Sequence, residues 1–378
     1  MRQDFADAPD KDEIIDALRS LKSGKAAGDS GIKPEHLKAL IGNPDALQLL
    51  ISTIHDFWET GNTPEHWNSL CLKTLPKSGD TTNVDRWRGI YLMDSVCKLV
   101  SKILQQRLDQ ILIEHGLECQ NGFMDGRGTT DGISILYQAL LKRREHQQAS
   151  WVVLLDLIKA FPGVPRELMF NILSKFGVPP KMVNLIKQLH TNVVAKFAIG
   201  TGDDETTTCT SGTKQGDPMA ATLFLYVIQA CLETVDLKGV EFQVPKDEFI
   251  GTKNHGPSGV KVERRRKWYI RELLSSLYAD DAGVIFATRE ELVDGFKILY
   301  KHFARFGLLI HVGRQVEDNN TGEITWGKSK TEIMYIPPFG CNYEDANTVI
   351  IYADDGNGIA RFTKKFKYLG FLLTPELT

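Results

Sequence analysis

The sequence predicts an α+β fold, because helix-like and strand-like segments follow one another without the strict alternation of a parallel α/β protein. Apolar residues recur every three or four positions over several segments, which is typical of amphipathic helices. Other segments are short, continuous apolar runs, which favours buried strands. The expected helices span 11–21, 45–59, 92–115, 131–145 and 290–306, and two more begin at Pro165 and Pro218. The expected strands span 151–157, 193–199, 331–336 and 368–373, with a hairpin over 273–287.

Length and composition indicate an ordinary globular protein of 378 residues with one large or two modest domains. The longest apolar run, 223–232, is too short to span a bilayer, and the acidic N-terminus lacks the pattern of a signal peptide. The six cysteines have no metal-ligand spacing, which argues against a zinc finger and suits a reducing compartment. We therefore expect an intracellular protein, nuclear or cytoplasmic, with no membrane partner. The polar segments 240–268 and 315–323 are expected to be surface insertions.

The charge balance gives no clear sign of a nucleic-acid partner. The net charge is −3, whereas a nucleic-acid-binding domain is usually basic. Basic runs occur at 142–144, 264–267 and 364–367. Each of these runs alone is more often a solvated face than a binding site, so both readings stay open.

Three carboxylates are the strongest candidates for chemistry. Asp156 interrupts an apolar strand, and Asp280 and Asp281 are adjacent at the tip of the expected hairpin. A carboxylate is rarely buried unless it is paired or binds a metal, and three close acids repel one another unless a cation neutralises them. Oxygen ligands select Mg²⁺, with Mn²⁺ as the alternative. Two such ions can promote an in-line phosphoryl transfer.

The tetrapeptide Tyr-Ala-Asp-Asp occurs twice, so it is weak evidence by itself. The first copy, 278–281, has apolar residues on both sides, as a buried hairpin requires. The second copy, 352–355, is followed by Gly-Asn-Gly, which is typical of a turn. We interpret the second copy as a surface turn and the first as the site.

In the order of its motifs, the sequence resembles the reverse transcriptases of non-LTR, or LINE-type, retrotransposons over about 22–370. The motifs that carry the resemblance are GKAAGDSGI at 24–32, LPKSGD at 75–80, WRGI at 87–90, QNGFMDGRGTTD at 120–131, LDLIKAF at 155–161, KQGDP at 214–218, YADD at 278–281, KTE at 330–332 and FKYLG at 366–370.

The resemblance implies roles for individual residues. Asp156, Asp280 and Asp281 would bind the catalytic metals, and Lys330 would donate a proton to the departing pyrophosphate. Nucleotide contacts would come from Lys77, Arg88, Phe161, Gln215 and Gly216, with the Phe161 ring excluding a ribose 2′-hydroxyl. Template and primer contacts would come from Gly122, Phe123, Arg127, Tyr368, Leu369 and Gly370.

Each of these residues also has an ordinary structural reading. Lys77 and Arg88 could be plain surface cations, Phe161 a core aromatic, and Asp217 a helix cap beside Gln215. The sequence departs from the family pattern at Gly89, Met124 and Pro162, and the proline fixes φ and removes a backbone donor.

The resemblance further implies a right-hand polymerase with fingers and a palm, in which helices flank an antiparallel palm sheet. We expect an N-terminal helical extension over 1–70 and a reverse transcriptase domain over 71–378. Within this domain the fingers would take about 71–150 and part of 163–215, and the palm about 151–162 and 216–378. The chain ends eight residues after Gly370, so we expect the thumb to be absent or truncated and no endonuclease to precede Met1.

The expected reaction is RNA-directed DNA synthesis with an RNA template, a DNA primer, dNTPs and two Mg²⁺ ions. Two alternatives stay open. One is an inactive retroelement remnant or RNA-binding fragment, which Met124, Pro162 and the expected absence of a thumb favour. The other is an RNA-directed RNA polymerase, which is disfavoured because the Phe161 ring would exclude a ribose 2′-hydroxyl.

Overall fold

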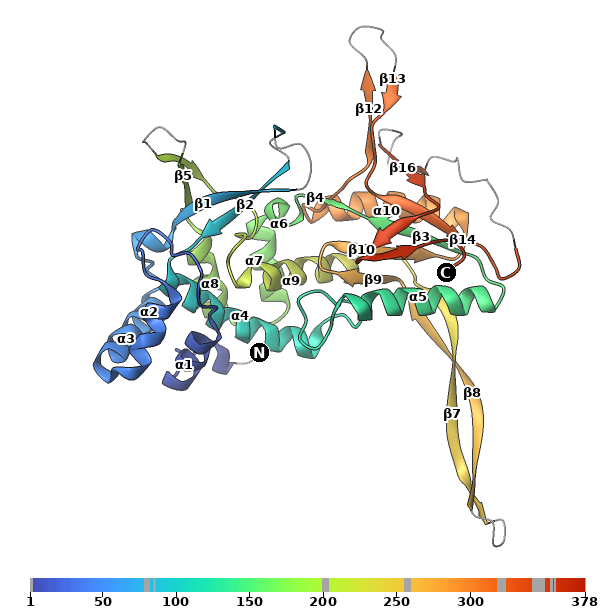
Figure 1. Cartoon of the computed structure of the whole chain (residues 1–378), viewed down its shortest axis with the longest axis horizontal. Coiled ribbons are helices and arrows are strands. Elements are labelled where there is room, and N and C mark those ends of the chain that lie inside the picture. Colours follow the sequence, from blue (N-terminus) through green and yellow to red (C-terminus); the bar gives the residue numbers. More distant parts are fainter. Residues whose placement is uncertain are drawn as a thin grey trace. The chain divides into compact units, whose positions relative to one another are not determined.

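The computed structural model describes residues 3–77, 82–83, 86–198, 204–254, 260–317, 324–341, 351–353, 356 and 358–377. It confirms a mixed fold of helices and sheets (Figure 1). The chain forms two compact units, and each is assembled from separate stretches of sequence. The first unit comprises 1–116, 159–233 and 306–308, and the second comprises 117–158, 234–305 and 309–378.

The first unit is mainly helical, with one four-stranded sheet in the order β2-β1-β5-β6. In this sheet β1 pairs with β2 antiparallel and with β5 parallel. Its helices are α1 (Lys11–Ser20), α2 (Pro34–Ala39), α3 (Pro44–Thr60), α4 (Ser95–His115), α6 (Ala160–Gly163), α7 (Arg166–Lys175), α8 (Pro180–His190) and α9 (Met219–Glu233), with short 3-10 helices η1 (Gln3–Ala6), η2 (Leu40–Gly42) and η3 (Glu65–Trp67). Its strands are β1 (Ser69–Pro76), β2 (Trp87–Leu92), β5 (Val194–Ala198) and β6 (Asp204–Thr208).

Helix α9 forms the centre of the first unit. It is apolar around most of its circumference and almost wholly buried, as expected for a helix surrounded by others. It packs against α4 and α7, and the Tyr226 hydroxyl donates a hydrogen bond to the carbonyl of Leu108 at 2.9 Å. The N-terminal helices join the same core, because Arg107 on α4 donates to the Glu13 carboxylate of α1 at 2.6 and 2.8 Å.

The second unit is built on a large sheet with the order β13-β12-β16-β14-β3-β10-β9, and β15 pairs with β16. The described pairings of this sheet are antiparallel except for the parallel pair of β14 and β16. Its helices are α5 (Thr129–Glu145) and α10 (Arg289–Arg305). Its strands are β3 (Ser150–Leu155), β4 (Leu157–Ile158), β7 (Val240–Asn254), β8 (Val260–Leu273), β9 (Ser275–Tyr278), β10 (Asp281–Phe286), β11 (Leu309–Ile310), β12 (Gly313–Glu317), β13 (Ile324–Trp326), β14 (Glu332–Ile336), β15 (Ile351–Tyr352), β16 (Gly358–Phe362), β17 (Phe366–Tyr368) and β18 (Phe371–Leu373).

Helices cover both faces of this sheet, which explains why β3 is apolar at successive positions. Helix α5 packs on the face that carries Val152 and Leu154, together with Ile285 and Met334. Helix α10 packs on the opposite face, where Gly295 lies directly against the ring of Phe286. Strand β3 therefore lies buried in the middle, and the residue that follows it is held at the end of a rigid element.

Several boundaries differ from the sequence expectation. The helix expected from residue 92 begins at Ser95, because Leu92 belongs to β2 and the Asp94 side chain accepts the N–H groups of Val96 and Cys97 as a cap. The strand expected over 368–373 is two strands, β17 and β18, with a turn between them in which Leu369 and Gly370 have positive φ.

The two polar segments expected to be surface insertions contain regular strands. The segment 240–268 lies mostly in the long antiparallel ribbon of β7 and β8, which extends from the rest of its unit (Figure 1). The segment 315–323 lies partly in the shorter pairing of β12 with β13. Local polarity indicated surface segments, and the structure shows that each forms a hairpin between strands that are consecutive in the sequence.

Candidate functional site

The three candidate carboxylates lie at one end of neighbouring strands of the second unit. Strand β10 pairs with β3 so that Ala282 is opposite Leu155, which brings the start of β10 to the end of β3. Asp281 is the first residue of β10, and Asp156 directly follows β3. Asp280 belongs to the two-residue turn between β9 and β10. The strand pairing therefore brings Asp156 to the adjacent pair Asp280 and Asp281, which lies more than a hundred residues later in the sequence.

The charges of these acids interact. Burial is the main factor that raises the pKa of Asp281 to about 6, and the negative charges of Asp280 and Asp156 add to it. Burial and the two neighbouring carboxylates thus both disfavour the ionised form of Asp281. A divalent cation at this position would relieve the repulsion.

Neighbouring residues fix the position of Asp156. Its backbone N–H donates to the Thr331 hydroxyl at 3.1 Å, and its carbonyl accepts the N–H of His311 at 2.8 Å. Thr331 is fully buried, so this anchor lies inside the fold. Lys330, the predicted proton donor, places its Nζ 3.7 Å from the Asp156 carboxylate, and its side chain remains 62% exposed. An exposed ammonium beside one of the acids partly balances their charge.

The oxygen donor set of the three acids fits Mg²⁺ or Mn²⁺. Within the part of the chain that the structure describes, no group of three His, Cys, Asp or Glu side chains is arranged to hold a metal ion by itself. Mg²⁺ usually keeps several waters and is bound by only one or two carboxylates in addition to other oxygen ligands.

The candidate phosphate-binding cations Lys77 and Arg88 belong to one hairpin of the first unit. Arg88 on β2 pairs with Leu75, and the N–H of Lys77 donates to the carbonyl of Arg86 at 2.7 Å, directly after β1. Both side chains are exposed. The alternation of side chains along paired strands places Lys77 and Arg88 on the same face of the hairpin, where both can reach one anionic group.

Phe161, the predicted gate for the ribose 2′-hydroxyl, stacks on Phe224 of α9 with a ring-centroid distance of 4.6 Å and an interplanar angle of 22°. Phe224 is fully buried, whereas Phe161 is partly exposed. The partner ring fixes one side of Phe161 and leaves part of it accessible. Phe161 is therefore neither a fully buried core aromatic nor a loose surface residue.

Pro162, a departure from the family pattern, lies in the first turn of the short helix α6. Backbone N–H groups in a first helical turn have no partner within the helix, so the proline removes no helical hydrogen bond. Its carbonyl accepts the Ser211 hydroxyl at 3.2 Å, and the carbonyl of Phe161 accepts the N–H of Thr213 at 3.0 Å. The backbone around Pro162 is thus well supported.

Gln215 and Gly216 form a tight turn before α9. The Gln215 carbonyl accepts the N–H of Tyr91 at 2.8 Å. Gly216 has φ +114°, and a Cβ there would lie 2.3 Å from the Tyr91 carbonyl oxygen, so the position admits only glycine. The Asp217 side chain accepts the N–H of Met219 at 2.9 Å, which confirms its reading as a cap.

Of the predicted template contacts, Gly122 is buried and Phe123 and Arg127 are exposed. The Arg127 guanidinium donates to the carbonyls of Leu117, Glu118 and Gln120, the last at 2.8 Å. Gly122 lies against the backbone of the 278–281 turn, where a Cβ would be 2.4 Å from the nitrogen of Ala279. Arg127 and Gly122 thus both contact the backbone of neighbouring segments and stabilise the local fold.

The predicted primer contacts lie in the β17–β18 hairpin. Tyr368 is buried, and its hydroxyl donates to the Ser276 carbonyl at 2.9 Å. Burial and the nearby charge of Asp281 act to raise the pKa of Tyr368. Leu369 and Gly370 form the turn and are more accessible. Tyr368 therefore links this hairpin to β9, the strand that leads into Asp280.

The second Tyr-Ala-Asp-Asp copy is described only in part. Tyr352 ends β15 and is 46% exposed, while Ala353 is buried. Residues 354 and 355, on which the surface-turn interpretation depends, lie outside the described residues.

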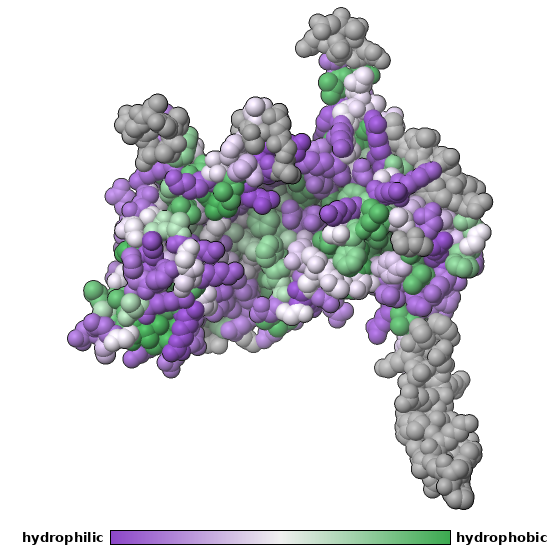
Figure 2. All heavy atoms as spheres, viewed as in Figure 1, coloured by the Kyte–Doolittle hydropathy of each residue, from purple (hydrophilic) through white to green (hydrophobic). Residues whose placement is uncertain are grey.

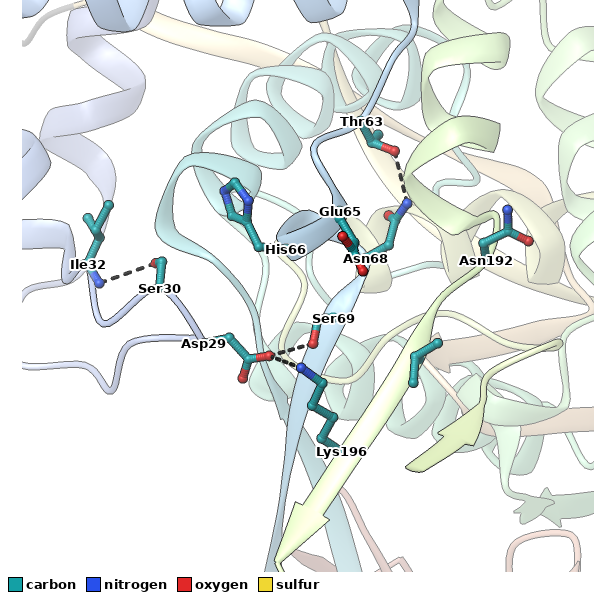
Figure 3. A pocket seen from close by; sticks show the side chains of 11 residues that line it. Asp29, Ser30, Ile32, Thr63, Glu65, His66, Asn68, Ser69, Asn192 and Lys196 are labelled. Atoms are coloured by element: carbon teal, nitrogen blue, oxygen red, sulfur yellow. Dashed lines mark hydrogen bonds and ion pairs between the residues drawn. The ribbon is translucent and has the colours of Figure 1, made fainter. Parts of the chain in front are cut away.

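A pocket of about 1010 Å³ lies in the first unit, and its lining includes Asp29, Ser30 and Ile32 of the motif at 24–32 (Figure 3). Asp29 accepts hydrogen bonds from the Ser69 hydroxyl and from the Lys196 ammonium, the latter at 2.9 Å. Burial acts to raise the pKa of Asp29, but these two hydrogen bonds outweigh it and hold the pKa below its ordinary value. With Glu65 also present, two carboxylates face one ammonium, so the lining does not favour a phosphate.

Sequence reasoning assigned no individual role to three residues that contact the candidate residues or their backbone, namely Thr331, Phe224 and Gln120. Thr331 and Gln120 lie in the motifs at 330–332 and 120–131, so motif membership was the available signal for these two. Phe224 lies in the long apolar run 223–232 and carries no comparable signal.

The fold and the site define a protein of helices and a mixed sheet, with three carboxylates at one end of neighbouring strands. The chain belongs to the family described as "Reverse transcriptase (RNA-dependent DNA polymerase)", which matches residues 75–315. The resemblance to non-LTR retrotransposon reverse transcriptases is confirmed by the chain's relatives.

One relative is the "Retrovirus-related Pol polyprotein from type-1 retrotransposable element R2" of Popillia japonica, 29% identical over 46% of this chain and 24% of the relative. Another is the "Transposon TX1 uncharacterized 149 kDa protein" of Xenopus laevis, 24% identical over 62% of this chain and 18% of the relative. A third is the Pol polyprotein of the type-2 element R2DM of Drosophila melanogaster, 23% identical over 55% and 19%.

The matches to these three curated relatives span 18% to 24% of the relatives' length. Among the described residues, no helix combines the length and the apolarity needed to cross a membrane. On the face of the molecule in Figure 2, hydrophilic and hydrophobic residues are interspersed.

Proposed function

We propose that this chain is the polymerase part of a non-LTR retrotransposon reverse transcriptase, which adds dNTPs to a primer 3′-hydroxyl on an RNA template. The observation that carries the proposal is the meeting of Asp156, Asp280 and Asp281 at one end of adjacent strands. The family match supports the reaction class, and the carboxylates supply its chemistry.

In this proposal Asp156, Asp280 and Asp281 hold two Mg²⁺ ions, with Mn²⁺ as a substitute. When bound, the ions activate the attacking hydroxyl and stabilise charge on the leaving pyrophosphate. The backbone N–H of Asp156 donates to Thr331, and its carbonyl accepts from His311. These two hydrogen bonds fix the backbone that carries the carboxylate. Lys330, beside Asp156, supplies a proton to the leaving group.

The first unit contributes the nucleotide contacts. Lys77 and Arg88 bind triphosphate oxygens, and Gln215 and Gly216 contact the incoming nucleotide along their backbone. The Phe161 ring, supported by Phe224, excludes a ribose 2′-hydroxyl and so selects deoxynucleotides. In the second unit, the exposed Phe123 and the hairpin turn at Leu369 and Gly370 are assigned to template and primer.

The test is extension of an oligo(dT) primer on poly(rA) with dTTP and Mg²⁺. We expect incorporation by the unmodified protein and a loss of at least about a thousandfold in Asp280→Ala, because removing a metal ligand removes several kcal/mol of transition-state stabilisation. The matched control is Asp16→Ala, an exposed acid on α1, which should keep full activity. Equal incorporation by the unmodified protein and Asp280→Ala, or none by either, contradicts the proposal.

The same assay separates DNA synthesis from RNA synthesis. We expect dTTP to be used in strong preference to UTP, and Phe161→Ala to accept UTP more readily, because the smaller side chain admits a 2′-hydroxyl. An unchanged preference in Phe161→Ala would show that this ring is not the gate. Efficient use of UTP by the unmodified protein would favour an RNA polymerase.

A further inference from the structure

We infer that Gln120 is a positioning residue for the turn that carries Asp280 and Asp281. Nothing in the sequence resemblance assigns Gln120 a role. The inference concerns the geometry of the turn itself, and only its activity readout rests on the proposed function.

The turn needs support because of its backbone conformation. Ala279, the residue before Asp280, has φ 58°, in the left-handed region that a residue with a Cβ rarely adopts. Glycine or asparagine is the usual choice there in a two-residue hairpin turn. Such a conformation persists only where the surrounding structure holds it, and it is often found at functional sites.

Gln120 provides that support through one oxygen atom. Its Oε1 accepts the N–H of Ala279 at 2.9 Å and the N–H of Gly122 at 2.8 Å. Both partners are donors, so the amide oxygen and not the amide nitrogen must face them. Gln120 is only 5% exposed, so water cannot easily replace this acceptor.

The backbone around Gln120 is fixed in turn by β9. The N–H of Leu277 donates to the Cys119 carbonyl, and the N–H of Asn121 donates to the Leu277 carbonyl, both at 2.9 Å. The segment 119–122 thus lies along the edge of β9. Gly122 is so close to Ala279 that a Cβ on Gly122 would lie 2.4 Å from the backbone nitrogen of Ala279. Gln120 therefore sits on a rigid base, and its oxygen sets where the turn and its acids lie.

Hydrogen exchange tests the inference without a measurement of enzymatic activity. Gln120→Met keeps the length and burial of the side chain but removes the acceptor. We expect amide exchange in a peptide covering 277–282 to be at least about tenfold faster, since a lost hydrogen bond of about 1.4 kcal/mol corresponds to a factor of ten. Gln120→Glu keeps an acceptor oxygen at the same reach and should retain protection.

The matched control is Gln229→Met, which removes a second buried glutamine whose amide donates to the His115 carbonyl at 2.7 Å. It should leave the 277–282 peptide unchanged. A peptide covering 332–336 on β14 reports on the rest of the sheet and should be unaffected in all variants. Unchanged protection of 277–282 in Gln120→Met, equal loss in Gln120→Glu, or faster exchange throughout the sheet would overturn the inference.

Primer extension gives the second readout. In Gln120→Met we expect kcat to fall about a hundredfold with little change in KM for dTTP, since displacing catalytic groups by about an ångström has an effect of this size. A fall in activity equal to that of Gln229→Met would overturn the positioning role. If the unmodified protein extends no primer, the proposed function fails, and hydrogen exchange still decides the role of Gln120.

Discussion

Single residues at the carboxylate site act mainly by fixing backbone. Ala279 in a left-handed conformation is strained by about 1–2 kcal/mol, and Gln120 and Gly122 hold it in place. Asp156 is fixed by the buried Thr331. Charged residues identified the site in the sequence, but the uncharged ones around them set its geometry.

Replacing Gly122 with alanine should disturb the site directly. The new Cβ would lie 2.4 Å from the Ala279 nitrogen and 2.8 Å from the Tyr278 carbonyl carbon, so the backbone must shift. We expect a loss of about 1–3 kcal/mol in the free energy of unfolding, with a larger proportional loss of primer extension. Chemical denaturation measures the first effect. Gly42→Ala, where a Cβ meets no atom within 4 Å, is the control, and equal effects in both variants would contradict this account.

A buried histidine should make the protein less stable in mild acid. His190 is 2% exposed, its Nδ1 bonds the Ile186 carbonyl, and its Nε2 has no hydrogen-bond partner among the described residues. Burial, and then the positive charge of Lys214, holds the pKa of His190 well below its ordinary value. The unfolded chain therefore binds a proton that the folded chain excludes.

We expect the free energy of unfolding to fall as the pH drops below about 6.5, with a slope of up to about 1.4 kcal/mol per pH unit from this residue. Denaturation midpoints between pH 7.5 and 5 measure the slope. His190→Gln should reduce it, and His115→Gln, at an exposed position, should not. Equal slopes in the two variants would show that His190 is not the cause.

At the scale of elements, the two pairings of strand β3 assemble the carboxylate site. Strand β3 is paired on one side with β10 and on the other with β14. The first pairing brings Asp281 to Asp156, and the second brings Lys330 and Thr331 to the same end of β3. The site is thus the place where three strands meet, and its precision comes from the register of the sheet.

The β7–β8 ribbon should be dispensable for folding. Its strands pair mainly with each other, and its base enters the core through Val240. Joining Val244 to Tyr269 with Asn-Gly, which suits a two-residue hairpin turn, should change the free energy of unfolding by less than about 1 kcal/mol. Val240→Ala should instead destabilise by about 1–3 kcal/mol. Thermal and chemical denaturation compare the two, and a shortened protein that fails to fold would contradict the prediction.

At the scale of the whole molecule, each compact unit is assembled from separate stretches of sequence. The first unit contains stretches of the chain that precede β3 and that follow it. Strand β3 itself belongs to the second unit. The candidate carboxylates all belong to the second unit, and the candidate nucleotide contacts Lys77, Arg88, Phe161, Gln215 and Gly216 belong to the first. Neither unit corresponds to one continuous segment, so both depend on the full chain.

Under the proposed function, dTTP and Mg²⁺ should stabilise the folded protein, because a ligand that binds only the folded chain shifts the equilibrium away from the unfolded chain. At a ligand concentration a hundred times Kd, the expected gain is about 2.7 kcal/mol. A thermal shift assay measures it as a higher Tm. The gain should be lost in Asp280→Ala and kept in Asp16→Ala. A similar gain in both variants would show that the nucleotide binds elsewhere.

The sequence by itself determined the mixed fold, most of the helices and the family. It also singled out the three acids as the candidate site. These follow from local signals, namely helical periodicity, apolar runs and motif order, as at 151–157 and 278–281. Boundaries such as Ser95 and the split of 368–373 into two strands were not predicted, because caps and turns depend on a few side-chain contacts.

Only the tertiary structure decided how the acids are held. The register of β3 with β10 places Asp156 beside Asp281, and the side chain of Gln120 reaches the turn from a segment more than 150 residues away in the chain. Strand register and side-chain hydrogen bonds between distant segments leave no periodic trace in the sequence, because they depend on three-dimensional contact. For the same reason the sequence marked the charged residues of this site but not the uncharged residues that position them.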